Sequence, residues 1–252
     1  MNVEDDASAQ SIIVIGSKPC AAFPMVKASV VLTANSAVER GLAYRKKYNS
    51  RIIAFVHGVG VQAGALRQSL VKSRPDEIVV MPAVLDSDNL VSIIKNDLGL
   101  TETIVSVISI RERNRLMADI LGWRKILVMA HVSKSRGIKH IRYALPDLLG
   151  PRKMMWLVHS TGLSAILYGM RRFPNAREII ATGIGLEGGV NFDGVGEFKE
   201  KIAKADRMTI KHWPHKKRLS LFTTDDSMSR IGNVPKWKGE LSYFEDTNLN
   251  KQ

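Results

Sequence analysis

Small and hydrogen-bonding residues follow four short apolar runs of this chain, and residues of these types suit anion binding. They are Gly16-Ser17, Asn35-Ser36, His57-Gly58 and Gly183-Ile184-Gly185. In an open parallel sheet, ligands bind outside the carboxyl ends of the strands, where backbone N–H groups can approach a phosphate. Loops are generally rich in Gly and Ser, so the joint placement of the four sites carries more weight than any one of them. The pattern predicts that a ligand binds at this edge of the sheet.

Two common phosphate-binding motifs are absent. The sequence contains neither the dinucleotide fingerprint G-x-G-x-x-G nor the loop G-x-x-x-x-G-K-S/T, and Gly183-Ile184-Gly185 lacks the third glycine. A nicotinamide dehydrogenase or an ordinary P-loop ATPase therefore has no positive support.

Alternating strands and helices are expected to position these residues. Apolar β-rich runs predict strands at Ser11–Ile15, Val30–Leu32, Ile52–Val56, Glu77–Met81, Glu178–Thr182 and Leu219–Thr223. Helices are expected at Ala37–Tyr48, Asn89–Leu98, Ile110–Leu121, Leu163–Arg171 and Glu197–Asp206, and the middle region at 86–150 is expected to be mainly helical. The alternation predicts an α/β fold with a mostly parallel, doubly wound, Rossmann-like sheet. We expect one domain over 11–240, a disordered N-terminus at 1–10 and a flexible tail at 241–252.

Composition and charge narrow the classes of partner. The 252 residues carry 37 Lys+Arg against 24 Asp+Glu, a formal charge of +13, with 45% hydrophobic and 24% charged residues. This composition is globular, and the surplus charge calls for an anionic partner: nucleic acid, a phosphorylated substrate or an anionic membrane surface. The single cysteine, Cys20, favours a reducing, cytoplasmic location. An acidic N-terminus and the lack of a long apolar run argue against a signal peptide and a membrane span.

Four segments, taken in order, resemble the landmarks of bacterial sialyltransferases. They are 12–19 (IIVIGSKP), 31–35 (VLTAN), 160–162 (STG) with the apolar helix that follows, and 178–184 (EIIATGI). The family pattern is a strand ending in Gly-Asn-Gly-Pro-Ser, a strand ending in Cys-Asn, a Thr-Ser-Gly helix start and a strand ending in Gly-Ile-Asp. The resemblance implies a GT-A-like sheet of the sialyltransferase type. It also implies transfer of a keto sugar acid (sialic acid, Kdo or a related ulosonic acid) from its CMP ester to a glycan or glycolipid acceptor.

The resemblance further implies that seven residues bind the CMP-sugar donor: Gly16, Ser17, Asn35, Ser160, Thr161, Gly162 and Gly183. Gly16 and Ser17 would bring backbone N–H groups to the phosphate, and Asn35 would bond the ribose or the phosphate end. The helix start at 160–162 would hold the cytidine or the sugar carboxylate. Gly183 would lie where the donor comes closest to the backbone.

The general base is less well defined. An inverting transferase needs a base for the acceptor hydroxyl, and a retaining one needs a nucleophilic carboxylate. The family's catalytic histidine lies in the loop after the last matched strand, but the loop at 187–196 contains no histidine. The catalytic candidates are Asp193, His212, Glu187 and His215. A solvated basic loop is the simpler interpretation of the two histidines, and a turn is the simpler interpretation of Asp193.

Family tyrosines that would stabilise the leaving phosphate are also missing, and Lys18, Arg207 or Lys211 could supply a cation instead.

Two acidic clusters could hold a cation. Asp86-Ser87-Asp88 has the form of an Asp-x-Asp metal motif, although a helix cap is the simpler interpretation. Asp225-Asp226-Ser227 could bind a cation or cap a last turn. The resemblance implies a metal-independent reaction with no permanently bound cofactor, because these enzymes stabilise the single phosphate of a CMP-sugar with side chains.

Two other functions remain open. A basic nucleic-acid-binding α/β protein would explain the charge, but the basic residues are spread along the chain and no RNA- or DNA-binding motif is present. A non-catalytic protein of the same fold would explain the missing histidine. The basic segments Arg40–Arg51, Lys134–Arg142 and Lys211–Arg218 suggest a peripheral position at the inner face of the membrane.

Overall fold

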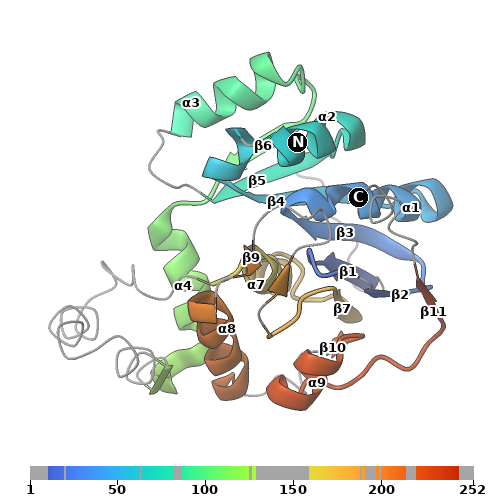
Figure 1. Ribbon diagram of the computed structural model, residues 1–252, viewed down its shortest axis with the longest axis vertical. Coiled ribbons are helices and arrows are strands. Elements are labelled where there is room, and N and C mark those ends of the chain that lie inside the picture. Colours follow the sequence, from blue (N-terminus) through green and yellow to red (C-terminus); the bar gives the residue numbers. More distant parts are fainter. Residues whose placement is uncertain are drawn as a thin grey trace, which may run out of the picture.

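A seven-stranded sheet forms the centre of the protein (Figure 1). The computed structural model describes residues 11–19, 21–62, 64–81, 87–124, 127–128, 159–187, 189–190, 197–198, 200–213 and 220–243. The sheet contains β1 (Ser11–Ile15), β3 (Ala28–Ala34), β4 (Arg51–His57), β5 (Glu77–Met81), β6 (Ile104–Val107), β7 (Glu178–Thr182) and β10 (Leu221–Thr223). Their order is β10-β7-β1-β3-β4-β5-β6, and each pair of neighbours is parallel.

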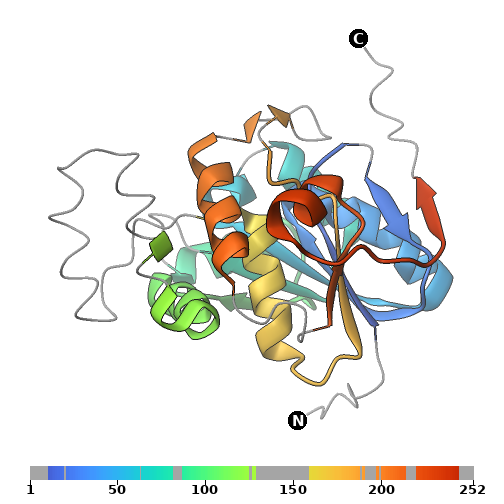
Figure 2. The same ribbon diagram turned by 90° about the horizontal axis from the view of Figure 1, so that it is seen from below.

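Helices cover both faces of the sheet (Figure 2). One face carries α1 (Val38–Tyr48), α2 (Gly64–Ser73) and α3 (Ser87–Ser92), which a π-helical turn at Ile93–Asp97 continues. The other face carries α4 (Ile110–Leu121), α7 (Thr161–Arg172), α8 (Glu200–His212) and α9 (Asp226–Gly232). Two short antiparallel pairs lie outside the sheet: β2 (Ala22–Pro24) with β11 (Leu241–Tyr243), and β8 (Gly189–Val190) with β9 (Glu197–Phe198). The fold is α/β and compatible with a Rossmann-like arrangement.

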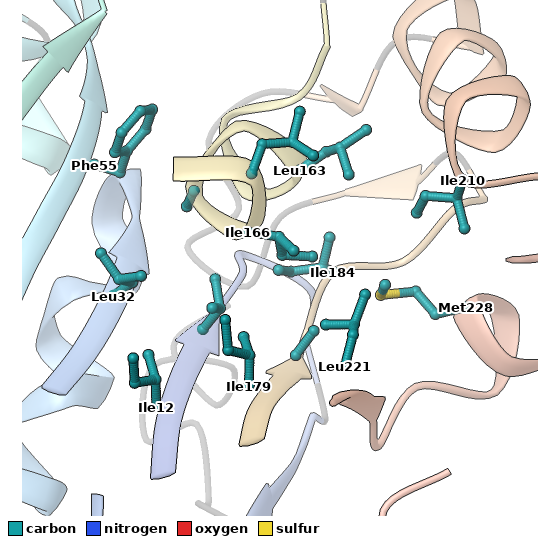
Figure 3. Packing of buried hydrophobic residues seen from close by; sticks show 14 of the residues in the cluster. Ile12, Leu32, Phe55, Leu163, Ile166, Ile179, Ile184, Ile210, Leu221 and Met228 are labelled. Carbon is teal, nitrogen blue, oxygen red and sulfur yellow. The ribbon is translucent and has the colours of Figure 1, made fainter. Parts of the chain in front are cut away.

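Continuous apolar strands explain the layered core. Alternate residues of a strand point to opposite faces, and a sheet covered on both sides needs apolar residues at every position. In β1, Ile12 and Val14 pack toward α7, while Ile13 and Ile15 pack toward α1. Figure 3 shows the first of these layers, in which Leu163 and Ile166 of α7 lie over the strands.

Most of the expected elements are confirmed. The strands at Ser11–Ile15, Glu77–Met81 and Glu178–Thr182 and the helix at Ile110–Leu121 have the predicted bounds. The expectation of a mainly helical region at 86–150 was wrong at Ile104–Val107, which is strand β6 at the edge of the sheet. An edge strand is half-exposed, so its short sequence lacks the continuous apolar run of the inner strands.

Three other elements differ from expectation. Helix α8 begins at Glu200 and runs to His212, past the expected end at Asp206. The first residues of the expected tail, Leu241–Tyr243, form β11 and pair with β2. Helix α2 was not predicted, because Gly64–Ser73 shows only weak amphipathic spacing. Among the helices that the structure describes, none combines the length and the apolar character needed to cross a bilayer.

Candidate functional site

The topological switch point of the sheet, where the order of strand addition changes side, lies between β1 and β7. From β1 the chain adds β3, β4, β5 and β6 on one side, and it later adds β7 and β10 on the other. In open α/β sheets, the crevice at such a switch point, outside the carboxyl ends of the strands, is the usual place for a ligand. We call this side of the sheet the carboxyl edge.

Gly16 and Gly183, which follow β1 and β7, contact each other at the switch point. The N–H of Gly16 donates to Thr182 O over 2.8 Å, and the N–H of Lys18 donates to Gly183 O over 2.9 Å. A β-carbon on Gly16 would lie 2.2 Å from Gly183 O, and Gly183 has a left-handed φ of +66°. Both glycines are therefore needed to join the two loops, and the N–H of Gly16 is engaged within the chain.

The carboxylate of Asp225 binds the loop after β7. The N–H groups of Gly183 and Ile184 donate to its two oxygens, over 2.9 and 2.7 Å. Burial raises the pKa of Asp225 to about 6, although these two N–H groups favour the ionised form. The sequence suggested only a cation ligand or a helix cap here. In the structure, this carboxylate accepts from the N–H of Gly183, the residue where the donor was expected to come closest to the backbone.

Lys18 and Glu187 come together beside this loop. The side chain of Lys18 runs along Gly185, where a β-carbon would meet its Cε at 2.8 Å. Burial lowers the pKa of Lys18, and the nearby charges of Glu187 and Asp225 oppose that shift. Glu187 is exposed and forms an ion pair with Arg230 at 2.6 Å. The structure thus brings one predicted cation and one predicted catalytic carboxylate to the carboxyl edge.

Asn35 connects three of the predicted segments. Its amide nitrogen donates to Thr161 Oγ1 over 3.2 Å, although the two residues are 126 positions apart. Its amide oxygen accepts from the N–H of His57 over 3.3 Å. Asn35 has a left-handed φ of 52°, which Asn tolerates better than most residues. Ser17 Oγ donates to Ala34 O over 3.0 Å, so the β1 loop is fixed to the same strand end.

Helix α7 starts at this point, with its N-terminus at the carboxyl edge. Ser160 is the N-cap: its hydroxyl accepts from the N–H of Leu163 over 3.1 Å, and its carbonyl accepts from Ser164 N over 3.0 Å. A β-carbon on Gly162 would lie 3.1 Å from Ile184, so this glycine lets α7 pack against the loop after β7. The helix predicted over Leu163–Arg171 is confirmed, with bounds Thr161–Arg172 and with Ser160 as its cap.

Two buried polar residues hold α8 against the start of α7. The N–H of Ser160 donates to Asp206 Oδ1 over 3.1 Å, and His159 Nε2 lies 2.7 Å from Thr209 Oγ1. Asp206 is fully buried, its Oδ2 has no hydrogen-bond partner, and burial raises its pKa to about 7. Sequence reasoning missed Asp206, because a lone acid in a charged helical segment usually faces solvent.

Among the other predicted residues, Arg207 reaches the loop after β7, where its guanidinium donates to Leu186 O over 2.9 Å. No described contact brings His212 to this loop. His212 is the last residue of α8, six positions after Asp206, or about 9 Å along the helix axis. Asp193 and His215 lie outside the described residues, as does Asp86 of the acidic cluster before α3. Within the described ranges, no group of three or more His, Cys, Asp or Glu side chains could hold a metal ion.

Comparisons with known proteins add no family to this description. The chain matches no protein-family model, and neither the curated proteins nor the solved structures contain a match to it. The functional interpretation therefore rests on the residues at the carboxyl edge.

Proposed function

We propose that the protein is a glycosyltransferase that moves a keto sugar acid (sialic acid, Kdo or a related ulosonic acid) from its CMP ester to a glycan or glycolipid acceptor. The contact between Asn35 and Thr161 supports this proposal more than any other observation. It joins two predicted donor-binding segments at the edge of the sheet where ligands of this fold class bind. The proposal includes the GT-A-like sialyltransferase variant of the fold.

The N-terminus of α7 is the proposed anchor for the donor. Within the described chain, the N–H groups of Thr161 and Gly162 make no hydrogen bond, whereas those of Leu163 and Ser164 are capped by Ser160. The start of a 12-residue helix carries partial positive charge, so a phosphate or carboxylate is stabilised there. Asn35, fixed by Thr161 and His57, would then face the ribose or the phosphate.

Lys18 and Glu187 are the proposed reacting groups on the other side of the switch point. Lys18 would stabilise the phosphate of the departing CMP, because its ammonium group is half-buried and lies near the end of β7. Glu187 would take the proton from the acceptor hydroxyl. Of the four catalytic candidates, Glu187 is the one whose charge acts on Lys18, so we assign it first. No metal ion enters this scheme.

The charge of +13 supports a peripheral location, with the enzyme in the cytoplasm and held against anionic lipid at the inner face of the membrane. A lipid-linked or surface glycan acceptor would then be within reach. We rank nucleic-acid binding below this proposal because the basic residues are spread along the chain and the sequence contains no RNA- or DNA-binding motif.

Release of CMP tests the proposed activity. Purified protein is incubated with CMP-sialic acid and with CMP-Kdo, water accepts the sugar acid, and the free CMP is measured by chromatography. We expect enzyme-dependent release above the spontaneous rate, with about 100-fold less release by Glu187→Gln, in line with the loss of a general base. Arg230→Gln, which removes only the surface partner of Glu187, is the matched control and should retain most of the release. CMP-sugars that stay intact in every assay would contradict the proposal.

A further inference from the structure

Arg113 is a half-buried cation without an acidic partner among the described residues. It lies in the first turn of α4, and its Nε is buried and makes no hydrogen bond. Two other half-buried arginines are paired with an acid: Arg51 and Arg172 both bind Glu77, at 2.9 and 2.5 Å. Arg113 therefore differs from Arg51 and Arg172.

An unpaired guanidinium in this setting is unfavourable for folding. Removing a charge from water costs free energy unless an opposite charge or hydrogen-bond acceptors replace the lost hydration. Burial lowers the pKa of Arg113 below its usual value, although the group remains charged at neutral pH. Such a cation is most simply explained if it is completed by an anion that binds to the folded protein.

The neighbours of Arg113 place it at the carboxyl edge. His57, at the end of β4, is close enough that the charge of Arg113 adds to the effect of burial in lowering the pKa of this histidine. The N–H of His57 donates to Asn35, and Asn35 donates to Thr161 at the start of α7. Helix α4 also packs against α7. Arg113 thus lies on a helix that packs against α7, and its charge acts on His57, whose N–H binds Asn35.

Local hydrogen bonds fix the turn that carries Arg113. Ser109 and Glu112 form a capping box: the N–H of Glu112 donates to Ser109 Oγ over 3.1 Å, and the N–H of Ser109 donates to Glu112 Oε2 over 2.8 Å. The N–H of Arg113 donates to Ser109 O over 3.0 Å. The carboxylate of Glu112 is used by this cap, so the nearest acidic residue in the sequence does not neutralise Arg113.

We propose that Arg113, together with His57 and Asn35, forms a subsite at the carboxyl ends of β3 and β4 that binds an oxyanion of the substrate. Guanidinium groups bind phosphate and carboxylate in the same two-pronged geometry, so the ligand is either the phosphate of the nucleotide or the carboxylate of the sugar acid. The choice between these two sources rests on the proposed function, whereas the existence of the subsite does not.

Titration of two variants with four ligands tests this proposal. Arg113→Gln removes the charge, and Arg115→Gln removes an exposed charge two residues further along α4 as the matched control. The ligands are CMP, cytidine, N-acetylneuraminate and inorganic phosphate, with binding measured by calorimetry. We expect Arg113→Gln to weaken phosphate binding at least tenfold, or about 1.4 kcal/mol, while Arg115→Gln leaves it within about twofold.

The ligands separate the two sources. If the subsite binds the nucleotide, Arg113→Gln weakens the binding of CMP tenfold and leaves the binding of cytidine unchanged. If the subsite binds the sugar acid, Arg113→Gln weakens the binding of N-acetylneuraminate and does not change the binding of CMP. If wild-type protein binds neither CMP nor N-acetylneuraminate, the proposed function fails, and inorganic phosphate alone decides the subsite. Phosphate binding that is absent from wild-type protein, or equal in wild-type and Arg113→Gln, would overturn the inference.

Stability without ligand gives a second readout. Without a bound anion, the half-buried charge of Arg113 destabilises the folded protein. Arg113→Gln should therefore unfold at the same temperature as wild-type protein or a few degrees higher. An unfolding temperature several degrees lower would show that Arg113 has a structural partner, and this result would also overturn the inference.

Discussion

The carbonyl oxygen of Gly183 lies only 2.2 Å from the position that a β-carbon on Gly16 would occupy. The two residues end neighbouring parallel strands, and their loops are joined by hydrogen bonds on both sides of this contact. Because the obstacle is backbone, no side-chain rotation can relieve it. The contact sets the spacing of the loops at the switch point, where the donor is proposed to bind.

Substitution of Gly16 by Ala should therefore destabilise the protein by about 1–3 kcal/mol, the usual cost of overpacking. Urea denaturation at neutral pH measures the change. Gly64→Ala is the control, because a β-carbon on Gly64 meets nothing within 4 Å. It should be neutral or stabilising by less than about 1 kcal/mol, as expected for Gly to Ala in a helix. Equal stability of Gly16→Ala and Gly64→Ala would show that the loops can move apart.

Asp206 should make the protein less stable as the pH rises. Its pKa of about 7 in the folded chain lies above the ordinary value of 3.8, so between these values the folded chain holds a proton that the unfolded chain releases. Stability due to this group is complete below pH 4 and is lost as the pH rises through 7. Asp225, with a pKa of about 6, acts in the same direction.

Asp206→Asn tests this dependence, because the amide oxygen can still accept from Ser160. We expect its stability relative to wild-type protein to increase on the order of 2 kcal/mol between pH 5 and pH 8. Asp226→Asn is the control, since Lys236 lowers the pKa of this exposed carboxylate. A stability difference for Asp206→Asn that does not change with pH would show that Asp206 is ionised throughout.

The capping box of α4 should contribute to stability and to the subsite at Arg113. Ser109→Ala removes the hydroxyl that binds Glu112, and we expect a loss of about 1 kcal/mol, typical of an N-cap. The Ser109 N–H and hydroxyl lower the pKa of Glu112, so the loss should be full at neutral pH and smaller in acid, where Glu112 is protonated.

Denaturation at pH 7 and pH 3, with phosphate binding at pH 7, measures both effects of Ser109→Ala. Ser92→Ala is the control, because the exposed Ser92 hydroxyl accepts only from Asn96 on the same segment. If Ser109→Ala binds phosphate as tightly as wild-type protein does, the cap does not determine the position of Arg113.

The inner strands could be predicted from sequence because burial on both faces leaves an uninterrupted apolar run, as in Ile12–Ile15. The N-cap of α7 could be predicted because Ser160 acts within its own helical turn. Strand β6 could not be predicted, because Ile104 is exposed and the other three residues of the strand are half-buried. Its sequence therefore shows neither a continuous apolar run nor an alternation of apolar and polar residues.

The candidate site was predicted only in part, for a related reason. Gly16, Asn35 and Gly183 stand at strand ends, and strand ends can be located from local sequence. Asp206, Asp225 and Arg113 acquire their roles from packing with distant segments, such as the hydrogen bond that the N–H of Gly183 donates to Asp225. Their local sequences look like charged helix surface or a helix cap. Burial and pairing, which distinguish them, arise only after folding.

Asn35→Gly and Asn49→Gly are a matched pair for testing the donor site. Both asparagines have a left-handed φ, which Gly accepts without strain. Asn49 ends α1 at the opposite edge of the sheet, whereas the amide of Asn35 contacts Thr161 and His57. The Asn35 substitution therefore removes the amide from the carboxyl edge and preserves the backbone, and the Asn49 substitution controls for the exchange itself.

Calorimetric titration with CMP is the most direct measurement of the central claim. We predict one CMP per chain, bound at least tenfold more tightly than AMP or UMP, with binding retained by Asn49→Gly and weakened at least tenfold, or about 1.4 kcal/mol, by Asn35→Gly. A wild-type protein that binds no CMP, or binds all three nucleotides equally, would contradict the claim that the carboxyl edge is a CMP-sugar site.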